Sequence, residues 1–318
     1  YIFGMKAYND MPFTPLKHTI AKYRWLYQLG LQGPDMFFYN IPILRHRDYR
    51  NVGSYMHEHK VNAFFECCLR RIGTIRSRQQ QEEAISYLAG FMNHYIADSI
   101  CHPYVYGRIG YPVDAPTSMH HGMHAHLENE LDAILLWKYK KKKPSEFNQT
   151  ATICLNGQEI QFISHFLASC INETYYPITY RNNFQVTPAM VHRSIWALRF
   201  GCRTLSDKNG KKKFGIAQVE SIFVNHPVAS AKMVTDSVTD YRSSCNLNHE
   251  AWSNPWDPTR VSTASFVDLF HETLDKCSRV YALLNSAVTD NMPLDKQDLS
   301  PLLAELGNES YHSGLPVD

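Results

Sequence analysis

The chain has 318 residues, of which 44% are hydrophobic and 19% are charged, a composition typical of a soluble globular protein with a substantial core. Its net charge of +2 and its pI near 8.1 are too mild to indicate a nucleic acid as partner. No stretch approaches the roughly 18 to 20 uninterrupted apolar residues that span a bilayer, so we do not expect an integral membrane protein.

Eight cysteines lie mostly inside apolar helical stretches, without a CxxC pair or a short-loop framework. This usage favours reduced, buried thiols and a cytoplasmic location. The beginning of the sequence lacks the basic and apolar regions of a signal peptide, but it also lacks an initiator methionine. Secretion after removal of a leader therefore stays open as the alternative.

Helical periodicity covers most of the chain and predicts an all-α fold. The expected helices run from Thr14 to Leu29 with Gly30 as the stop, from Ser54 to Arg71, from Gln79 to Ile100 with an end near Pro103, from Thr117 or Ser118 to the lysines at 138 and 140–143, and over 158–175, 188–205, 262–287 and 300–306.

Two segments depart from this helical pattern. Asn156-Gly157 is a hairpin signal and predicts two short strands within residues 150–162. Residues 206–260 form the least regular region. We expect a single large domain in which residues 1–205 form a helical metal-binding core, while residues 206–318 add an irregular segment and C-terminal helices packed on that core.

The most informative motif is the series His94, Asp98 and His102. A spacing of four places two imidazoles and a carboxylate along one stripe of a helix. A single histidine is more often a surface or core residue than a ligand, but this stripe lies within apolar, core-forming sequence. Ionisable groups in such a setting are costly unless they are paired or bound to a metal.

A second pair with the same spacing, His124 and Glu128, follows after a short loop. Imidazole and carboxylate ligands without a thiolate are typical of catalytic zinc, which keeps one coordination position open for water. Two such helices indicate more than one ion. Taken alone, Asp35 in Gly33-Pro34-Asp35 suggests an ordinary turn residue, and His57 near a helix start is equally consistent with a ligand or an exposed residue.

Taken together, these motifs resemble the zinc-dependent phospholipase C family, all-helical bacterial enzymes that carry three zinc ions. The similarity extends over about residues 1–140 and follows the order Gly33-Pro34-Asp35, His57, His94-x3-Asp98-x3-His102-Pro103 and His124-x3-Glu128-x3-Asp132. It implies an all-α fold of the zinc phospholipase C and single-strand zinc nuclease type. It also implies two to three Zn²⁺ ions, with the ligands Asp35, His57, His94, Asp98, His102, His124 and Glu128.

The resemblance further implies a role for each position. Asp35 matches the aspartate that acts as general base beside the metal-bridging water. His57 and His94 match the ligands of one zinc, and the aspartate that matches Asp98 bridges this ion to another.

His102, His124 and Glu128 match the ligands of the remaining zinc. Secreted members use an N-terminal tryptophan and an early histidine for the third ion, and neither is present here. We expect the missing histidine to lie just upstream of Tyr1. The interval between Asp98 and His102 is shorter than in the secreted members, and the segment after residue 140 carries no motif that aligns with the family. These differences bear on the identity of the substrate more than on metal binding.

The function implied by this resemblance is hydrolysis of a phospholipid or a related small phosphodiester, with peripheral membrane contact as a further expectation. Two alternatives stay open. The first is a nucleotide phosphodiesterase or nuclease of the same architecture, although those enzymes usually carry aspartate at the position of Glu128. The second is a non-catalytic, zinc-stabilised helical protein.

Several further side chains near the motifs have more than one interpretation. His120 lies on the His124 face of its helix and is a candidate substitute ligand, whereas His126 is expected to be exposed. Four tyrosines either line the pocket or belong to the core: Tyr95, Tyr104, Tyr106 and Tyr111. The lysine tail indicates a solvated helix end rather than a membrane contact.

Overall fold

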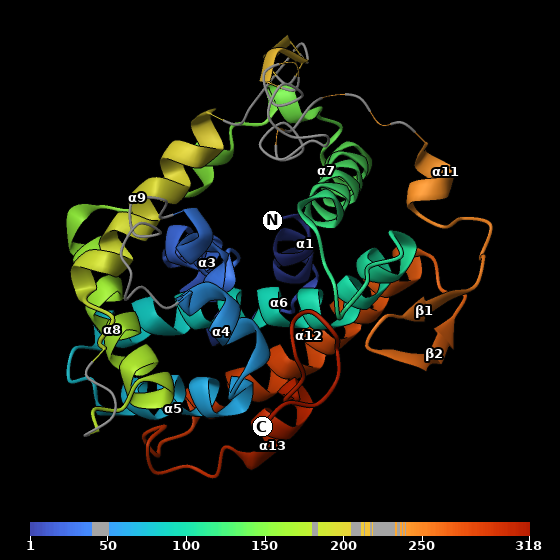
Figure 1. Ribbon diagram of the computed structural model, residues 1–318. Coiled ribbons are helices and arrows are strands. Elements are labelled where there is room, and N and C mark those ends of the chain that lie inside the picture. Colours follow the sequence, from blue (N-terminus) through green and yellow to red (C-terminus); the bar gives the residue numbers. More distant parts are fainter. Residues whose placement is uncertain are drawn as a thin grey trace.

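The computed structural model describes residues 1–39, 51–179, 184–204, 211, 212, 214–216, 218, 233, 236, 238 and 240–318. Within these ranges the chain is helical except for loops and one small sheet, which confirms the all-α prediction (Figure 1). Much of the predicted irregular region lies outside the described residues. Every residue that was predicted to hold a metal lies within them.

The centre of the fold is α6 (Arg78–Arg108), a helix of 31 residues. Figure 1 shows it crossing the middle of the molecule, with α12 alongside. Apolar residues surround most of α6, as expected for a helix that other helices enclose. The helices packed against it include α1 (Ile2–Asp10), α2 (Pro15–Lys22), α3 (Arg24–Gly30), α5 (Val61–Thr74), α8 (Gly157–Tyr175) and α12 (Phe266–Thr289), and α7 (Ser118–Lys140) also contacts it.

The remaining elements surround this centre. They are η1 (Gly33–Tyr39), α4 (Val52–Glu58), α7 (Ser118–Lys140), η3 (Pro144–Glu146), η4 (Gln149–Thr152), α9 (Pro188–Thr204), α11 (Tyr241–Ser244), β1 (Trp252–Asn254), β2 (Asp257–Ser262) and α13 (Ser300–Leu306). The strands β1 and β2 pair in antiparallel fashion. The C-terminal segment that follows α13 folds back toward α4 and α6 (Figure 1).

The helix predicted over Thr14–Leu29 is two helices. Thr14 caps α2 as expected, with its Oγ1 accepting from the Lys17 amide at 3.2 Å. The break falls at Tyr23, whose backbone is not helical. Its carbonyl accepts a hydrogen bond from Ser86 Oγ at 3.0 Å. A contact made by tertiary packing, and invisible to local periodicity, thus divides the helix.

Ser54 was predicted to begin a single helix, and this prediction is wrong in two respects. The N-cap is Asn51, whose side chain accepts from the Ser54 amide at 3.2 Å. The helix also stops at Glu58, and the chain turns through Lys60, which has a φ of 48°, before α5 begins. His57 consequently lies in the last turn of the short helix α4.

The predicted end of a helix near Pro103 is also wrong, because α6 continues to Arg108. Proline inside a helix removes one hydrogen bond and costs about 3 kcal/mol. The turn beyond it is nevertheless buried, and Tyr104 Oη donates to the Ser244 carbonyl at 2.7 Å. Packing of this last turn therefore outweighs the local preference of proline.

The hairpin predicted over 150–162 does not form. Asn156 is the N-cap of α8: its Oδ1 accepts from the Glu159 amide at 2.9 Å, and Glu159 Oε2 accepts from the Asn156 amide at 2.8 Å. The small sheet lies instead at 252–262. Its second strand occupies the predicted start of the 262–287 helix, which begins at Phe266 after Ser265 as N-cap.

Six of the eight cysteine thiols are buried, Cys67 is half-buried and Cys154 is exposed, and all eight are free. The burial of most of these thiols agrees with the prediction made from the sequence. Among the described residues, no helix combines the length and the apolar character that crossing a membrane requires.

Close contact between α3 and α6 depends on two glycines. A Cβ atom at Gly30 would lie 2.1 Å from the Tyr87 carbonyl oxygen, and one at Gly90 would lie 2.1 Å from the Tyr27 carbonyl oxygen. Gly30, predicted as a helix stop, is the last residue of α3 and also permits this crossing. The crossing fixes the start of η1, and therefore Asp35, against α6.

We predict that Gly90→Ala lowers the free energy of unfolding by about 1 to 3 kcal/mol, because overpacking against a neighbouring backbone outweighs the better helix propensity of alanine. Urea denaturation measures the change. The matched control is Gly157→Ala, where an added Cβ meets nothing within 4 Å. Equal stability of Gly90→Ala and the parent would contradict the predicted role of this crossing.

Candidate metal centre

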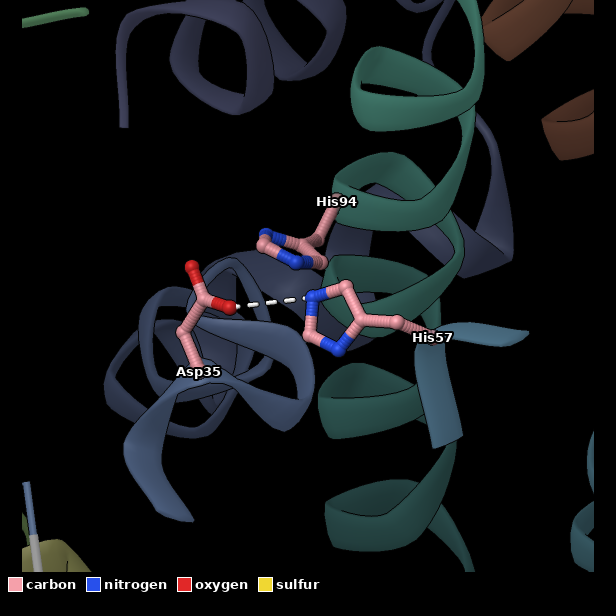
Figure 2. A group of neighbouring side chains, drawn as sticks. All are labelled: Asp35, His57 and His94. Atoms are coloured by element: carbon pink, nitrogen blue, oxygen red, sulfur yellow. Dashed lines mark ion pairs between the residues drawn. The ribbon is translucent and has the colours of Figure 1, made fainter. Parts of the chain in front are cut away.

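Three of the predicted ligands meet between η1, α4 and α6. Figure 2 shows Asp35, His57 and His94 turned toward one another from these three elements. Each offers one ligand atom, and these atoms all lie within 4.8 Å of one another. Asp35 Oδ1 is 3.1 Å from His57 Nε2. Residues that are ordinary in isolation, a turn aspartate and a helix-end histidine, thus form a candidate cation site.

Backbone groups orient both histidines of this first group. His57 Nδ1 donates to the Gly53 carbonyl at 2.7 Å, and His94 Nδ1 donates to the Leu31 carbonyl at 3.2 Å. Each bond assigns the proton to Nδ1 and leaves Nε2 for a cation. Gly33, with a φ of 48°, passes so close to His94 that a Cβ would lie 2.0 Å from its Cδ2 atom. Only glycine permits this approach.

A second group joins the end of α6 to α7. His102, His124 and Glu128 also place ligand atoms within 4.8 Å of one another. Glu128 Oε1 is 3.0 Å from His102 Nε2 and 3.1 Å from His124 Nε2. The Tyr311 carbonyl accepts from His102 Nδ1 at 2.8 Å, so the Nε2 atom of His102 is directed to the centre of the group.

Asp98 lies between the two groups. Its Oδ2 atom is 3.1 Å from His94 Nε2 and 3.8 Å from His102 Nδ1. The stripe predicted from the spacing of four is therefore present on α6, and it connects the two groups through one carboxylate. This arrangement places six predicted ligands and Asp35 in one continuous cluster.

Buried polar atoms without a hydrogen-bond partner indicate that the cluster fits a metal. Such atoms are His94 Nε2, Asp98 Oδ2 and His124 Nδ1. The first two are 3.1 Å apart, yet they are not aligned as a hydrogen bond. Buried polar atoms are costly when unpaired, and a shared cation would satisfy this pair. The donors are imidazole nitrogens and carboxylate oxygens, which suit zinc.

Electrostatic interactions keep the carboxylates ionised. Burial alone would raise the pKa of Asp98, but the positive charges of His94 and His102 outweigh it and hold this pKa well below its usual range. Burial alone would likewise raise the pKa of Glu128, but His124 and His102 together hold it well below its usual range. Burial would lower the pKa of His102, but Asp98 and Glu128 raise it to about 10. A cation that binds here must therefore displace protons.

The neighbouring histidines do not join either group. His120 Nδ1 interacts with Thr117 Oγ1 at 2.9 Å and caps the first turn of α7, so its predicted use as a substitute ligand is not what the structure shows. The His126 side chain is 51% exposed and faces Glu130 at 3.7 Å, as expected for a residue outside the centre.

The four tyrosines divide between core and site. Tyr95 and Tyr104 are fully buried in the core. The Tyr106 ring lies 4.4 Å from that of His124 and 4.7 Å from that of Tyr111, so these two tyrosines border the second group. The lysines at 138 and 140–143 are exposed around the end of α7, consistent with a solvated helix end.

Sequence reasoning missed two residues at the centre, Tyr311 and His312. The His312 ring lies 4.9 Å from the His57 ring and 5.8 Å from the His102 ring. No helical spacing relates either residue to the ligand motifs, and a lone histidine in a loop carries no signal of its own. Only the folded chain brings them to the site.

Comparison with protein families agrees with this geometry. The family model described as zinc dependent phospholipase C matches residues 2–179, which is more than half of the chain. The protein therefore belongs to the zinc-dependent phospholipase C family, and the resemblance seen in its motifs is confirmed. Family membership implies zinc as the metal and a hydrolase activity. No curated protein and no solved structure matches the chain.

We predict that zinc raises the thermal unfolding midpoint of the metal-free protein, since a ligand that binds only the folded state stabilises it. At 100 times the Kd the gain is about 2.7 kcal/mol, which corresponds to about 4 °C for a chain of this size. Differential scanning calorimetry with and without a chelator measures the shift. An unchanged midpoint at saturating zinc would contradict the assignment.

We also predict that His94→Ala and Asp98→Ala lose bound zinc, because each removes a donor from the stripe on α6. Metal content is measured by inductively coupled plasma mass spectrometry, and circular dichroism verifies that both variants fold. The control is His18→Ala, which changes an exposed histidine on α2. Full zinc content in His94→Ala would remove this residue from the ligand set.

Proposed function

We propose that this protein is a zinc-dependent phosphodiester hydrolase that cleaves phospholipids into diacylglycerol and a phosphorylated head group. The observation that supports this most directly is the pair of three-residue groups connected by Asp98, in a chain that belongs to the zinc-dependent phospholipase C family. Two adjacent cation sites suit a phosphodiester, whose two non-bridging oxygens share one negative charge.

The first ion would be held by His57 and His94 of the first group together with Asp98, while Asp35, the third member of that group, would serve the attacking water. The other ion would be held by His102, His124 and Glu128. When bound, zinc acts as a Lewis acid that activates water at neutral pH and stabilises charge on phosphoryl oxygens. The chain prepares for this through ionised carboxylates and through histidines whose Nδ1 atoms are held by carbonyl groups.

Asp35 differs from the histidines in its position and accessibility. It lies in the first turn of η1, and its side chain is 42% exposed, whereas the His57 side chain beside it is 1% exposed. A carboxylate that reaches both the cluster and solvent is placed to act as general base. In the proposed step, Asp35 takes a proton from the water that attacks phosphorus, and the phosphorus–oxygen bond to diacylglycerol breaks. The proton held by Asp35 then passes through solvent to the leaving oxygen, which restores the carboxylate.

We predict that Asp35→Asn lowers kcat by about 10²- to 10⁴-fold, because the amide cannot accept the proton. Hydrolysis of micellar phosphatidylcholine and of a chromogenic phosphodiester measures the loss. Zinc content should change little, since asparagine keeps the size of the side chain and one ligand oxygen. Asp275→Asn, at an exposed position of α12, is the matched control. Turnover at the parental rate in Asp35→Asn would remove Asp35 from the proposed step.

The same assay separates the alternative functions. Glu128 favours a phospholipase over a single-strand nuclease, because the related nucleases usually have aspartate there. Chelator-sensitive hydrolysis of phosphatidylcholine with no cleavage of single-stranded DNA would support the proposal. The reverse result would favour the nuclease. A zinc-loaded protein that cleaves neither substrate would favour a non-catalytic role.

A further inference from the structure

A C-terminal segment from a distant part of the chain lies against the metal centre. We call residues 308–318 the C-terminal strap. It folds back on itself, with the Val317 amide donating to the Asn308 carbonyl at 2.9 Å and the Ser310 amide donating to the Leu315 carbonyl at 2.8 Å. The Asn62 amide at the start of α5 donates to Asn308 Oδ1 at 3.0 Å. These bonds hold the strap in a folded form and attach it to the start of α5.

Tyr311, in the middle of the strap, contacts one histidine from each group. Its amide donates to the His57 carbonyl at 2.9 Å, and its carbonyl accepts from His102 Nδ1 at 2.8 Å. The Tyr311 side chain is buried, with its ring 4.8 Å from the His57 ring. One residue of the strap therefore touches α4 and α6 at the two positions that carry these histidines.

His312 adds a second link between the same two histidines. Its ring is nearly parallel to that of His57, at 12° and 4.9 Å, and to that of His102, at 21° and 5.8 Å. The orientation of the His312 ring is fixed in turn, because its Nδ1 lies 3.1 Å from Tyr106 Oη. The imidazole therefore stacks on one member of each candidate zinc group.

Gly314 allows the strap to approach α6 this closely. It has a φ of 59°, and a Cβ atom would lie 2.5 Å from the Ser99 carbonyl oxygen and 3.1 Å from Pro103 Cγ. Proline has no amide hydrogen, so Pro103 leaves the Ser99 carbonyl without its usual helical donor. The strap packs against α6 at Ser99 and Pro103, which directly follow Asp98 and His102 in the chain.

We propose that the C-terminal strap is part of the metal centre, and that His312 is a positioning residue which holds the two zinc-ligand groups in register by stacking on His57 and His102. This inference rests on the proposed zinc site. Neither group contains His312 among its mutually close ligand atoms. Its role is therefore to restrict the rotation of two ligands and to keep their spacing, a function for which outer-sphere partners of a metal site are known.

The proposal distinguishes the ring of His312 from its nitrogens. We expect His312→Ala to weaken zinc binding by about 10- to 100-fold, the range typical of lost outer-sphere contacts. His312→Phe keeps a flat ring for stacking and should retain most of the affinity. Competition with a chromophoric chelator measures zinc affinity directly, without reference to turnover. Parental affinity in His312→Ala, or an equal loss in His312→Phe, would overturn the proposal.

A second pair of variants tests the strap itself. Gly314→Ala should displace the strap and weaken zinc binding to a similar extent as His312→Ala. Gly110→Ala is the matched control, because Gly110 has nearly the same φ, 62°, but an added Cβ meets nothing within 4 Å. Both changes place alanine in the left-handed region, so only the contact with α6 differs. Equal zinc affinity of the two variants would show that the strap does not position the centre.

Kinetics complete the test. A positioning residue should affect kcat more than KM at saturating zinc, since it sets the geometry of the centre rather than contacts with the lipid. An unchanged kcat in zinc-saturated His312→Ala would argue against positioning. If the parent binds zinc but hydrolyses no phosphodiester, the proposed function fails, whereas the ratios of zinc affinity still decide the role of the strap.

Discussion

The structure depends on the presence of ionisable groups inside a helix that other helices enclose. His94 and His102 are buried on α6 with Asp98 between them, and burial alone disfavours the charge of each group. Mutual attraction outweighs this cost and keeps the groups charged, yet His94 Nε2 and Asp98 Oδ2 still lack a hydrogen bond. A cation between them would resolve the conflict. The glycines at the crossing of α3 and α6, the short helix α4 and the turn at Gly33 all bring further donors to this stripe.

Much of the site could be predicted from the sequence, because helical spacing is a local property. The positions four apart on α6 and α7 meet as the spacing requires, and the order of motifs identified the family. Asp35 and His57 carried little signal alone and gained meaning only from that order. The strap could not be predicted, since the bond between His102 and Tyr311 joins residues 209 positions apart with no pattern between them.

The errors in the predicted fold have a common physical cause. Pro103 and the Asn156-Gly157 pair are signals that act locally, and in each case a competing interaction decided the outcome. Packing of the last turn of α6 outweighed the tendency of Pro103 to end the helix. Reciprocal capping by Asn156 and Glu159 outweighed the turn preference of asparagine and glycine. The break at Tyr23 likewise reflects a bond to Ser86 that no local pattern reveals.

The distant origin of the strap has a consequence for biogenesis. The ligands on η1, α4, α6 and α7 leave the ribosome long before residue 314. A nascent chain would therefore expose these metal ligands before the strap can contact His57 and His102. Contacts of such high sequence separation also form late and slowly during folding. Correct metallation is therefore expected to follow, rather than to accompany, synthesis of the helical core, and premature capture of a competing ion is the hazard that this order creates.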